Sequence, residues 1–320
     1  MNLSIALCTY NATAYLSEQL ASIAAQTRLP DELVVCDDCS GDATAAAVRQ
    51  FAARAPFEVR LEVNDRNLGT AANFAKAAGL CRGRFIALCD QDDVWMPHKL
   101  QLLHDALVRH PRAGFAFSNA RIVDRHRRPL GYNLWEAIRF PRSEQRRMNR
   151  GQAASVLLHR NVVTGATMAF RADYRDLLLP VAHGWLHDGW FALLLAAVAD
   201  CVAVPEPLIE YRQHPGQQVG ARKETLFQQF LRARSFGQEK YESIAANYAA
   251  ARDRLAQCPM PLRDPGLLPA IERKVKHYGA RTRMREEGTW RLPLILRELV
   301  WHHYTRFSTG WKSFAQDLLL

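Results

Sequence analysis

The sequence lacks the glycine motifs that bind phosphates in the commonest nucleotide-binding proteins. No Gly-x-Gly-x-x-Gly follows the first predicted strand, and no Gly-Lys-Thr loop occurs anywhere in the 320 residues. In those motifs, closely approaching backbone amides hold the phosphates. Their absence argues against a nicotinamide-dependent dehydrogenase and against an ordinary ATPase.

Cysteine is present but does not form the patterns of a disulfide or zinc protein. The seven cysteines make an odd count, and most lie in apolar segments, which predicts reduced, buried thiols in a cytosolic protein. Cys36 and Cys39 have the spacing of a redox or zinc pair, but no second pair completes a zinc site. We interpret that spacing as coincidental.

Long hydrophobic runs and a basic leader are also missing. The strongly apolar stretch at 191–204 is interrupted by Asp200 and is too short to span a bilayer. The first residues read as a strand, with no secretion signal. We therefore expect a cytoplasmic protein, with a peripheral position at the inner membrane face as a further expectation.

Positive charge is concentrated near the end of the chain. The net charge is +10, and residues 221–320 contain 18 Lys and Arg against 10 Asp and Glu. Such a region suits nucleic acid, an anionic membrane surface or an acidic substrate. Because no nucleic-acid-binding module is recognisable, we expect no nucleic acid as a partner and favour an anionic membrane surface.

Strands and helices alternate through the first hundred residues. Buried strands are predicted at 3–8, 32–36, 59–63 and 85–89, with helices at 14–25, 43–53 and 70–79 between them. This alternation predicts an α/β fold with a largely parallel sheet flanked by helices.

Polar clusters follow three of these four strands. They are Thr9-Tyr10-Asn11, Asp37-Asp38 and Asp90-Gln91-Asp92-Asp93. Ligands of parallel sheets bind at the carboxyl ends of the strands, so we expect one site here. Three carboxylates in four residues repel one another unless water or a cation screens them, and hard oxygen ligands favour Mg²⁺ or Mn²⁺.

The middle of the chain is less regular. A helix is predicted at 99–109 and a strand at 114–118, whereas residues 121–150 have little periodicity and contain nine arginines. Two interpretations of 121–150 stay open: a solvated loop with some helix, or a mobile flap over an anionic ligand.

Asp188 lies between Trp185 and Trp190 at the start of an apolar helix. An acid at this position is often only a helix cap, but flanking tryptophans favour a partly dry surface where a carboxylate can accept a proton. A strand is predicted at 202–206, and His214 is the histidine that we single out as functional.

The C-terminal region reads as helical at 223–256 and 269–287, with prolines between the two segments. Residues 292–320 combine aromatic and basic side chains, which is compatible with a core-packing helix or with a face on lipid head groups. We favour the lipid face.

Several segments, taken in order, resemble the inverting, nucleotide-sugar-dependent glycosyltransferases of family 2, which have the GT-A fold. They are Thr9-Tyr10-Asn11, the segment 34–44, Asn67-Leu-Gly69 with Asn73, and the segment 83–93. The forms Asp-Gln-Asp-Asp-Val-Trp, His-Asp-Gly-Trp and Tyr-Arg-Gln-His further resemble bacterial rhamnosyltransferases of polysaccharide and O-antigen assembly. Cys39 departs from the usual glycine, and 221–320 matches no pattern of the family.

The resemblance implies roles for particular residues. Asp188 would be the catalytic base. Mg²⁺ or Mn²⁺ would be held by Asp90, Asp92, Asp93 and His214. The nucleotide sugar would contact Thr9, Tyr10, Asn11, Asp37, Asp38, Asn67, Gly69, Asn73, Asp90 and Arg212. We assign acceptor contacts to Trp95, Thr164, Gly165 and Trp190.

The expected organisation is a GT-A catalytic domain at 1–220 and a basic, helical region at 221–320. We divide the first into a nucleotide-binding half, 1–118, and an acceptor-binding half, 119–220. The expected donor is dTDP-rhamnose or a UDP-sugar. The expected acceptor is a growing cell-surface glycan, and we also consider a lipid-linked form of this glycan.

Two alternatives share these features. A nucleotidyltransferase that makes sugar nucleotides also has a parallel sheet and metal-binding carboxylates, but Thr9-Tyr10-Asn11 is not its usual glycine-rich basic loop. A non-catalytic sugar-nucleotide-binding member of a membrane glycan-assembly complex would keep the fold without the reaction.

Overall fold

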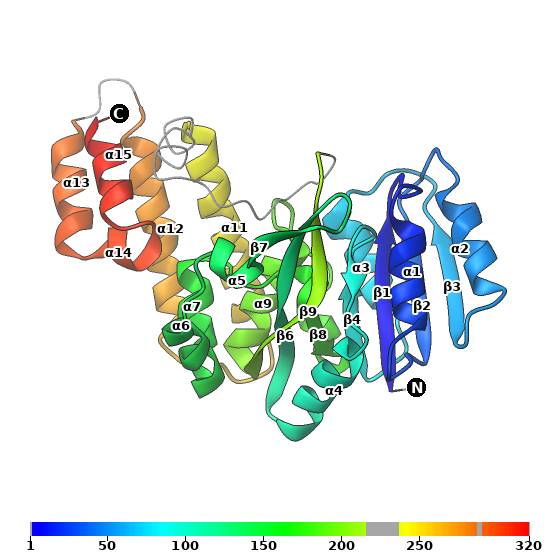
Figure 1. Cartoon of the computed structure of the whole chain (residues 1–320). Helices are drawn as coiled ribbons and strands as arrows, with labels where there is room; N and C mark the ends of the chain where they lie inside the picture. Colours follow the sequence, from blue (N-terminus) through cyan, green and yellow to red (C-terminus); the bar gives the residue numbers. More distant parts are fainter. Residues whose placement is uncertain (1, 216–236, 287–289, 320) are drawn as a thin grey trace.

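The first third of the chain forms the parallel part of a nine-stranded sheet (Figure 1). The computed structural model describes residues 2–215, 237–286 and 290–319. Strands and helices alternate here as β1 (Leu3–Thr9), α1 (Leu16–Ala24), β2 (Glu32–Asp37), α2 (Thr44–Ala52), β3 (Glu58–Val63), α3 (Thr70–Leu80) and β4 (Phe85–Cys89). All strand pairs among β1 to β4 are parallel, with β1 between β2 and β4. The predicted α/β alternation is confirmed.

The remainder of the sheet is mixed. The full order is β3-β2-β1-β4-β8-β6-β9-β5, with β7 paired to β6. The added strands are β5 (Val94–Trp95), β6 (Ala113–Asp124), β7 (Pro129–Asn133), β8 (Met168–Arg171) and β9 (Asp200–Gln213). Strand β8 is antiparallel to both β4 and β6, whereas β6 and β9 are parallel. Because β6 crosses the predicted 118/119 boundary, the two halves share one sheet.

Two segments contain more regular structure than predicted. Residues 121–150 are largely ordered: β6 continues to Asp124, a hairpin joins it to β7, and the helices α5 (Leu134–Ala137) and α6 (Arg142–Arg147) follow. The strand predicted at 202–206 is one long strand, β9, despite Pro205 and Pro207. Register shifts in its pairing with β6 accommodate these residues, because a proline cannot donate a hydrogen bond to the ladder.

Helices pack on both sides of the strands and fix their ends. Helix α3 contacts β1 and β2, and α4 (Lys99–Arg109) contacts β6 and β9. Helix α9 (His187–Val198) is buried over most of its length and contacts α3, β6 and α7 (Ala153–His159). The short helix α8 spans Arg175–Leu178. Helix α9 therefore begins close to the carboxyl ends of the parallel strands.

The C-terminal region is built on the same core. Helices α11 (Gln238–Ala256) and α12 (Leu267–Arg283) pack on one another, and their buried Leu255 and Ile271 belong to the cluster that contains the sheet residues. Lys274 of α12 is buried and donates from Nζ to the carbonyl oxygen of Leu158. The part of the predicted helix 223–256 before 237 lies outside the described residues.

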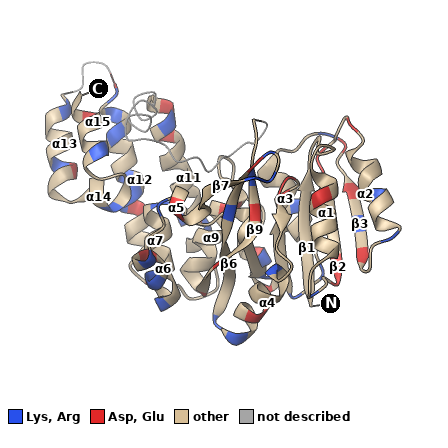
Figure 2. Cartoon of the chain, viewed as in Figure 1, with Lys and Arg blue, Asp and Glu red and all other residues tan. Residues whose placement is uncertain are grey.

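The end of the chain forms three helices, α13 (Arg291–Val300), α14 (His303–Phe307) and α15 (Trp311–Leu319). Tyr304 and Phe307 are buried, but Trp301 and Trp311 are exposed. Lys and Arg residues occur along these C-terminal helices (Figure 2). Within the described residues, no helix combines the length and apolar character that crossing a bilayer requires.

Candidate functional site

The acidic loop, residues 90–93, connects β4 to β5 at the carboxyl ends of the parallel strands. Asp93 is fully buried; its Oδ1 accepts a hydrogen bond from the backbone N of Arg212 at 3.1 Å. Its Oδ2 is also buried and has no hydrogen-bond partner within the described part of the chain. Burial, followed by repulsion from Asp92 and Asp90, raises the pKa of Asp93 well above its usual value. The loop therefore holds carboxylates together against their mutual repulsion.

Asp188 lies within electrostatic reach of this loop. The pKa of Asp90 is raised to about 7, mainly by burial and then by the nearby charges of Asp92 and Asp188. Residues almost a hundred positions apart in sequence thus contribute to one negative field, because α9 begins beside the end of β4. The structure brings Asp90, Asp92, Asp93 and Asp188 together.

The first turn of α9 fixes the carboxylate of Asp188. Its Oδ1 accepts from the backbone N of Gly189 at 2.5 Å and from Nδ2 of Asn161 at 3.4 Å, and its Oδ2 accepts from the backbone N of Gly165 at 3.4 Å. Burial outweighs the backbone hydrogen bonds from Gly189 and Gly165 and raises the pKa of Asp188 to about 6. A carboxylate with this pKa is charged at neutral pH and can still accept a proton readily.

The residues predicted to bind a divalent cation fit that role chemically. His214 follows β9, and its Nε2 lies 2.8 Å from Oδ2 of Asp92. Carboxylate oxygens with one imidazole are donors that suit Mg²⁺ or Mn²⁺. A cation would also neutralise the repulsion within the acidic loop and give the unpartnered Asp93 Oδ2 a positive neighbour.

Arg212, predicted to lie near the diphosphate, has a buried side chain. It is 1% exposed and donates to the carbonyl oxygen of Asp92 at 2.7 Å, to that of Arg125 at 2.8 Å, and to Glu18 at 3.1 Å. These interactions keep the guanidinium inside the protein, and its position near the diphosphate stays a prediction. Arg212 anchors the acidic loop to β9, α1 and the β6–β7 hairpin.

The clusters after β1 and β2 are interlocked. Asp37 is fully buried and accepts from Thr9 Oγ1 at 2.7 Å and from Ser40. Asp38 accepts from the backbone N of Leu68 at 2.7 Å and of Gly69 at 2.9 Å. The side chain of Asp37 is not exposed in this structure, and its contact with the nucleotide stays a prediction. In this structure Thr9 and Asp38 are also buried and shape the loops around the site.

Other predicted nucleotide contacts lie along the same edge of the sheet. Tyr10 and Asn11 are exposed, and Gln91 connects Tyr10 to the acidic loop through hydrogen bonds to both its backbone N and O. Asn67 is exposed and Gly69 has a φ of +83°, which favours glycine. Asn73 is buried and bonds to the carbonyl oxygen of Cys36 at 2.8 Å, so its direct contact with a ligand is not supported.

Two of the four residues predicted to contact the acceptor are buried in this structure. Trp95 and Trp190 are 3% and 1% exposed, because both rings pack in the core. Thr164 is partly exposed, and Gly165 contributes its backbone N to Asp188. These two residues stay next to the site, with Gly165 acting through Asp188.

Lys99 is a residue that the sequence analysis missed. It is fully buried, its Nζ donates to the carbonyl oxygen of Ala166 at 2.6 Å, and its charge lowers the pKa of Asp90 and Asp93. Burial lowers the pKa of Lys99 itself to about 7. No sequence pattern distinguishes this lysine from a surface lysine in the first turn of a helix.

Comparisons with known proteins agree with this architecture. The model of the family described as "Glycosyl transferase family 2" matches residues 4–176, more than half of the chain. An uncharacterized protein of Mycobacterium tuberculosis is 30% identical over 220 residues, which are 66% of this chain and 59% of that protein. The chain thus spans about three fifths of that relative. An Escherichia coli protein named UDP-Glc:alpha-D-GlcNAc-diphosphoundecaprenol beta-1,3-glucosyltransferase is 32% identical over 121 residues, 38% of this chain and 46% of that protein.

Solved structures show the same fold at low sequence identity. Staphylococcus aureus TarS 1-349, in complex with UDP-GlcNAc, has a TM-score of 0.57 and 16% identity, covering 99% of this chain and 89% of TarS 1-349. A mannosyltransferase from Pyrobaculum calidifontis, in complex with GDP-Man and Mn²⁺, has a TM-score of 0.53 and 17% identity, covering 99% and 85%. The fold is therefore the GT-A-like α/β fold with C-terminal helices, and the chain belongs to glycosyl transferase family 2.

Proposed function

We propose that the protein is an inverting, metal-dependent glycosyltransferase that moves a sugar from a nucleotide-diphosphate donor to a hydroxyl of a cell-surface glycan. The observation that supports this most is the electrostatic proximity of Asp188 to the acidic loop. It gives one site both a cluster of cation ligands and a separate carboxylate that can accept a proton.

The proposed reaction is a single displacement at the anomeric carbon. The acceptor oxygen forms a bond to C1 as the bond from C1 to the phosphate oxygen breaks, and that electron pair leaves with the nucleoside diphosphate. Asp188 accepts the proton of the attacking hydroxyl. Because one displacement inverts C1, one base is sufficient. General-base assistance of this kind contributes about 10²- to 10⁴-fold to the rate.

A bound Mg²⁺ or Mn²⁺ would supply positive charge to the leaving diphosphate. We assign its ligands to Asp92, with Asp90, Asp93 and His214 in support. Arg212 holds this loop in place from behind through the carbonyl oxygen of Asp92 and the carboxylate of Asp93. It also bonds to the carbonyl oxygen of Arg125, so the basic turn at 125–128 borders the acidic loop.

Donor identity is proposed by resemblance and by analogy with relatives. We place dTDP-rhamnose first and UDP-hexoses second. The acceptor is proposed to be lipid-linked, because the name of the E. coli relative includes a diphosphoundecaprenol acceptor. Incubation with each donor and Mn²⁺, measured as release of free nucleoside diphosphate, would identify the donor.

Asp188→Asn tests the role of the base. The amide has almost the same shape, so we expect normal folding and donor binding with transfer reduced by about 10²- to 10⁴-fold. Donor affinity measured by calorimetry and transfer measured by diphosphate release separate the two effects. Asp105→Asn on α4 is the matched control and should transfer normally. Full turnover by Asp188→Asn would remove Asp188 from this role.

A further inference from the structure

The outward face of α13 is apolar although the helix lies at the surface. Leu292, Leu296, Leu299 and Val300 have the i, i+4, i+7, i+8 spacing of one helix face, and Trp301 follows. These five side chains are between 42% and 72% exposed. A surface helix normally turns such a stripe to the core, but here Ile295 and Glu298 of the opposite face are buried instead. The apolar face, defined as these five residues, is therefore available to a partner.

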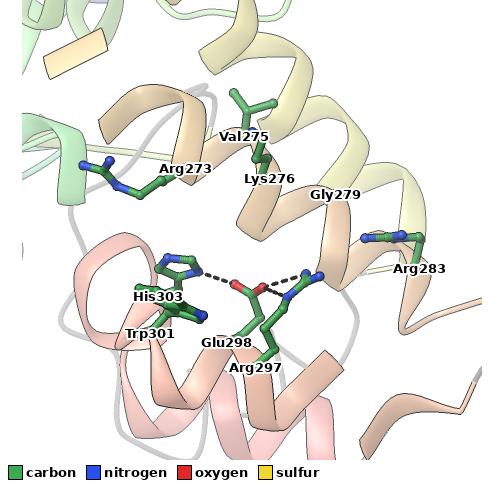
Figure 3. Close-up of a pocket in the computed structure, with 9 residues that line it drawn as sticks. All are labelled: Arg273, Val275, Lys276, Gly279, Arg283, Arg297, Glu298, Trp301 and His303. Carbon is green, nitrogen blue, oxygen red and sulfur yellow. Dashed lines mark hydrogen bonds and ion pairs between the residues drawn. The ribbon is translucent and has the colours of Figure 1, made fainter. Parts of the chain in front are cut away.

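A basic cavity of about 720 Å³ adjoins this face between α12 and α13 (Figure 3). Its basic lining residues are Arg273, Lys276, Arg283 and Arg297, and its lining also includes Trp301, which follows directly after α13. Figure 3 shows Arg273 and Arg283 at opposite ends of the cavity. The cavity thus opens beside the C-terminal end of α13.

Glu298, the carboxylate in the cavity lining, is already neutralised from within the protein. Its Oε2 lies 2.8 Å from Nδ1 of His277 and 2.7 Å from Nδ1 of His303, and its Oε1 accepts from Arg297 at 2.9 Å. These contacts lower the pKa of Glu298 to about 2 against the effect of burial. Glu298 therefore does not compensate the charges of Arg273 and Arg283, whereas Lys276 is paired with Glu272 at 3.5 Å.

Arg273 and Arg283 have no carboxylate partner among the described residues. The Nε of Arg273 is buried, and within the same part of the chain it has no hydrogen-bond partner. A buried, unpartnered donor on a cation is costly unless an anion or water reaches it. The cavity is thus suited to an anionic oxygen group such as a phosphate.

A second copy of the chain fits this surface poorly. A symmetric dimer places the same patch of each copy against the other, so it would bring two sets of uncompensated arginines together. An anionic bilayer instead supplies phosphates for the cavity and acyl chains for the apolar face. Exposed tryptophan is also typical of the membrane interface.

We infer that α12 and α13 form a docking surface for an anionic phospholipid bilayer, with lipid phosphates in the basic cavity and the apolar face of α13 in the acyl layer. Helix α13 has ten residues, so it lies in the interface plane and does not cross the membrane. The inference deepens the proposed function. Membrane docking itself does not depend on that function, but its purpose rests on it: the docked enzyme would meet a lipid-linked acceptor at the membrane.

Co-sedimentation of the full chain with vesicles tests this inference directly. Vesicles of phosphatidylcholine alone are compared with vesicles containing one third phosphatidylglycerol, in the absence of donor and metal. We expect binding to the anionic vesicles that weakens with salt. Leu296→Glu with Val300→Glu should reduce the bound fraction at least tenfold. Val108→Glu, at an exposed valine of α4, is the matched control and should bind like the unmodified protein.

The basic cavity is tested separately. Arg273→Ala with Arg283→Ala should remove the preference for anionic vesicles, whereas Arg49→Ala with Arg54→Ala, at α2, should keep it. Circular dichroism checks that each variant folds. Equal binding by the Leu296→Glu, Val300→Glu variant would overturn the inference. Binding of inorganic phosphate without vesicle binding would also overturn it. A dimer of the unmodified protein, detected by light scattering, that the Leu296→Glu, Val300→Glu variant converts to monomers would overturn it as well. Because no donor is present, these outcomes are independent of Asp188→Asn.

Discussion

Asp188 combines two properties that a general base needs, a fixed position and a raised pKa. The backbone N of Gly165 and Nδ2 of Asn161 hold its oxygens, and burial raises its pKa to about 6. A solvated aspartate would be a weaker base, with a pKa near 4. The surroundings of Asp188 therefore increase its basicity while keeping it charged at neutral pH.

The pH dependence of kcat/KM should report this pKa. Below about pH 6 the carboxyl of Asp188 is protonated and cannot accept a proton, so we expect kcat/KM to fall about tenfold per pH unit on the acidic side. Above about pH 6 the carboxylate is charged, so kcat/KM should no longer rise with pH. Saturating Mn²⁺ keeps the acidic loop deprotonated during the measurement. An acidic limb near pH 4 would contradict a desolvated Asp188.

At the scale of elements, the site depends on close packing between α9 and the turn before β8. A Cβ at Gly165 would overlap Nε2 of His187, whose ring stacks on Phe74 with centroids 3.8 Å apart. Both ring nitrogens of this buried histidine lack a hydrogen-bond partner within the described residues. Burial lowers its pKa to about 3, so the ring is neutral at neutral pH.

Gly165→Ala should therefore be destabilising. We expect a loss of about 1–3 kcal/mol in the free energy of unfolding, because overpacking forces neighbouring groups to shift. Transfer should also decrease, since the backbone N of residue 165 would move away from Asp188. Gly279→Ala on α12, where an added Cβ meets no atom within 4 Å, is the control and should be neutral or stabilising. Equal urea midpoints for the two variants would disprove the packing argument.

The sequence was sufficient to place the polar clusters at one edge of the sheet but not to show which members face a ligand. Asp37 and Asp90 both lie at the ends of buried strands, yet only the structure shows that Thr9 and Ser40 donate hydrogen bonds to the carboxylate of Asp37. The burial of Arg212 was not predictable for the same reason, since its partner Glu18 lies 194 positions away. Partners distant in sequence decide whether a polar side chain is exposed, and no local pattern contains them.

Periodicity also failed where an element deviates from its usual pattern. Strand β9 includes two prolines and still continues for 14 residues, because shifts in register accommodate them. A strand and two helices in the arginine-rich segment 121–150 were not predicted, because the apolar residues there are few and the elements are short. By contrast, the long alternating segments at 3–89 were predicted correctly.

At the scale of the whole molecule, helices α11 and α12 share one hydrophobic core with the sheet, whereas Ile295 of α13 packs in a smaller second cluster with Ala280 and Met284. Ile271 of α12 is fully buried in the cluster that also contains the strands β1, β2 and β4. The chain also makes polar contacts across this boundary, such as Arg263 to Asp200 at 2.7 Å. Elements that share a core are expected to unfold together.

Ile271→Ala should therefore destabilise the whole chain. We expect a loss of about 2–5 kcal/mol in the free energy of unfolding, with one transition that coincides by far-UV and near-UV circular dichroism. Val300→Ala, at an exposed position of α13, should change the free energy by less than about 0.5 kcal/mol. Two separate transitions in the unmodified protein would show that the C-terminal helices form an independent unit.

The most direct test is a crystal structure of the protein with Mn²⁺ and a nucleoside diphosphate, using anomalous scattering at the manganese edge. We predict one strong anomalous peak beside Asp92, with the diphosphate on the cation and the Asp188 carboxylate facing the open side of the terminal phosphate. A manganese peak away from residues 90–93, or a nucleotide remote from Asp188, would contradict the proposal that both lie in one catalytic site.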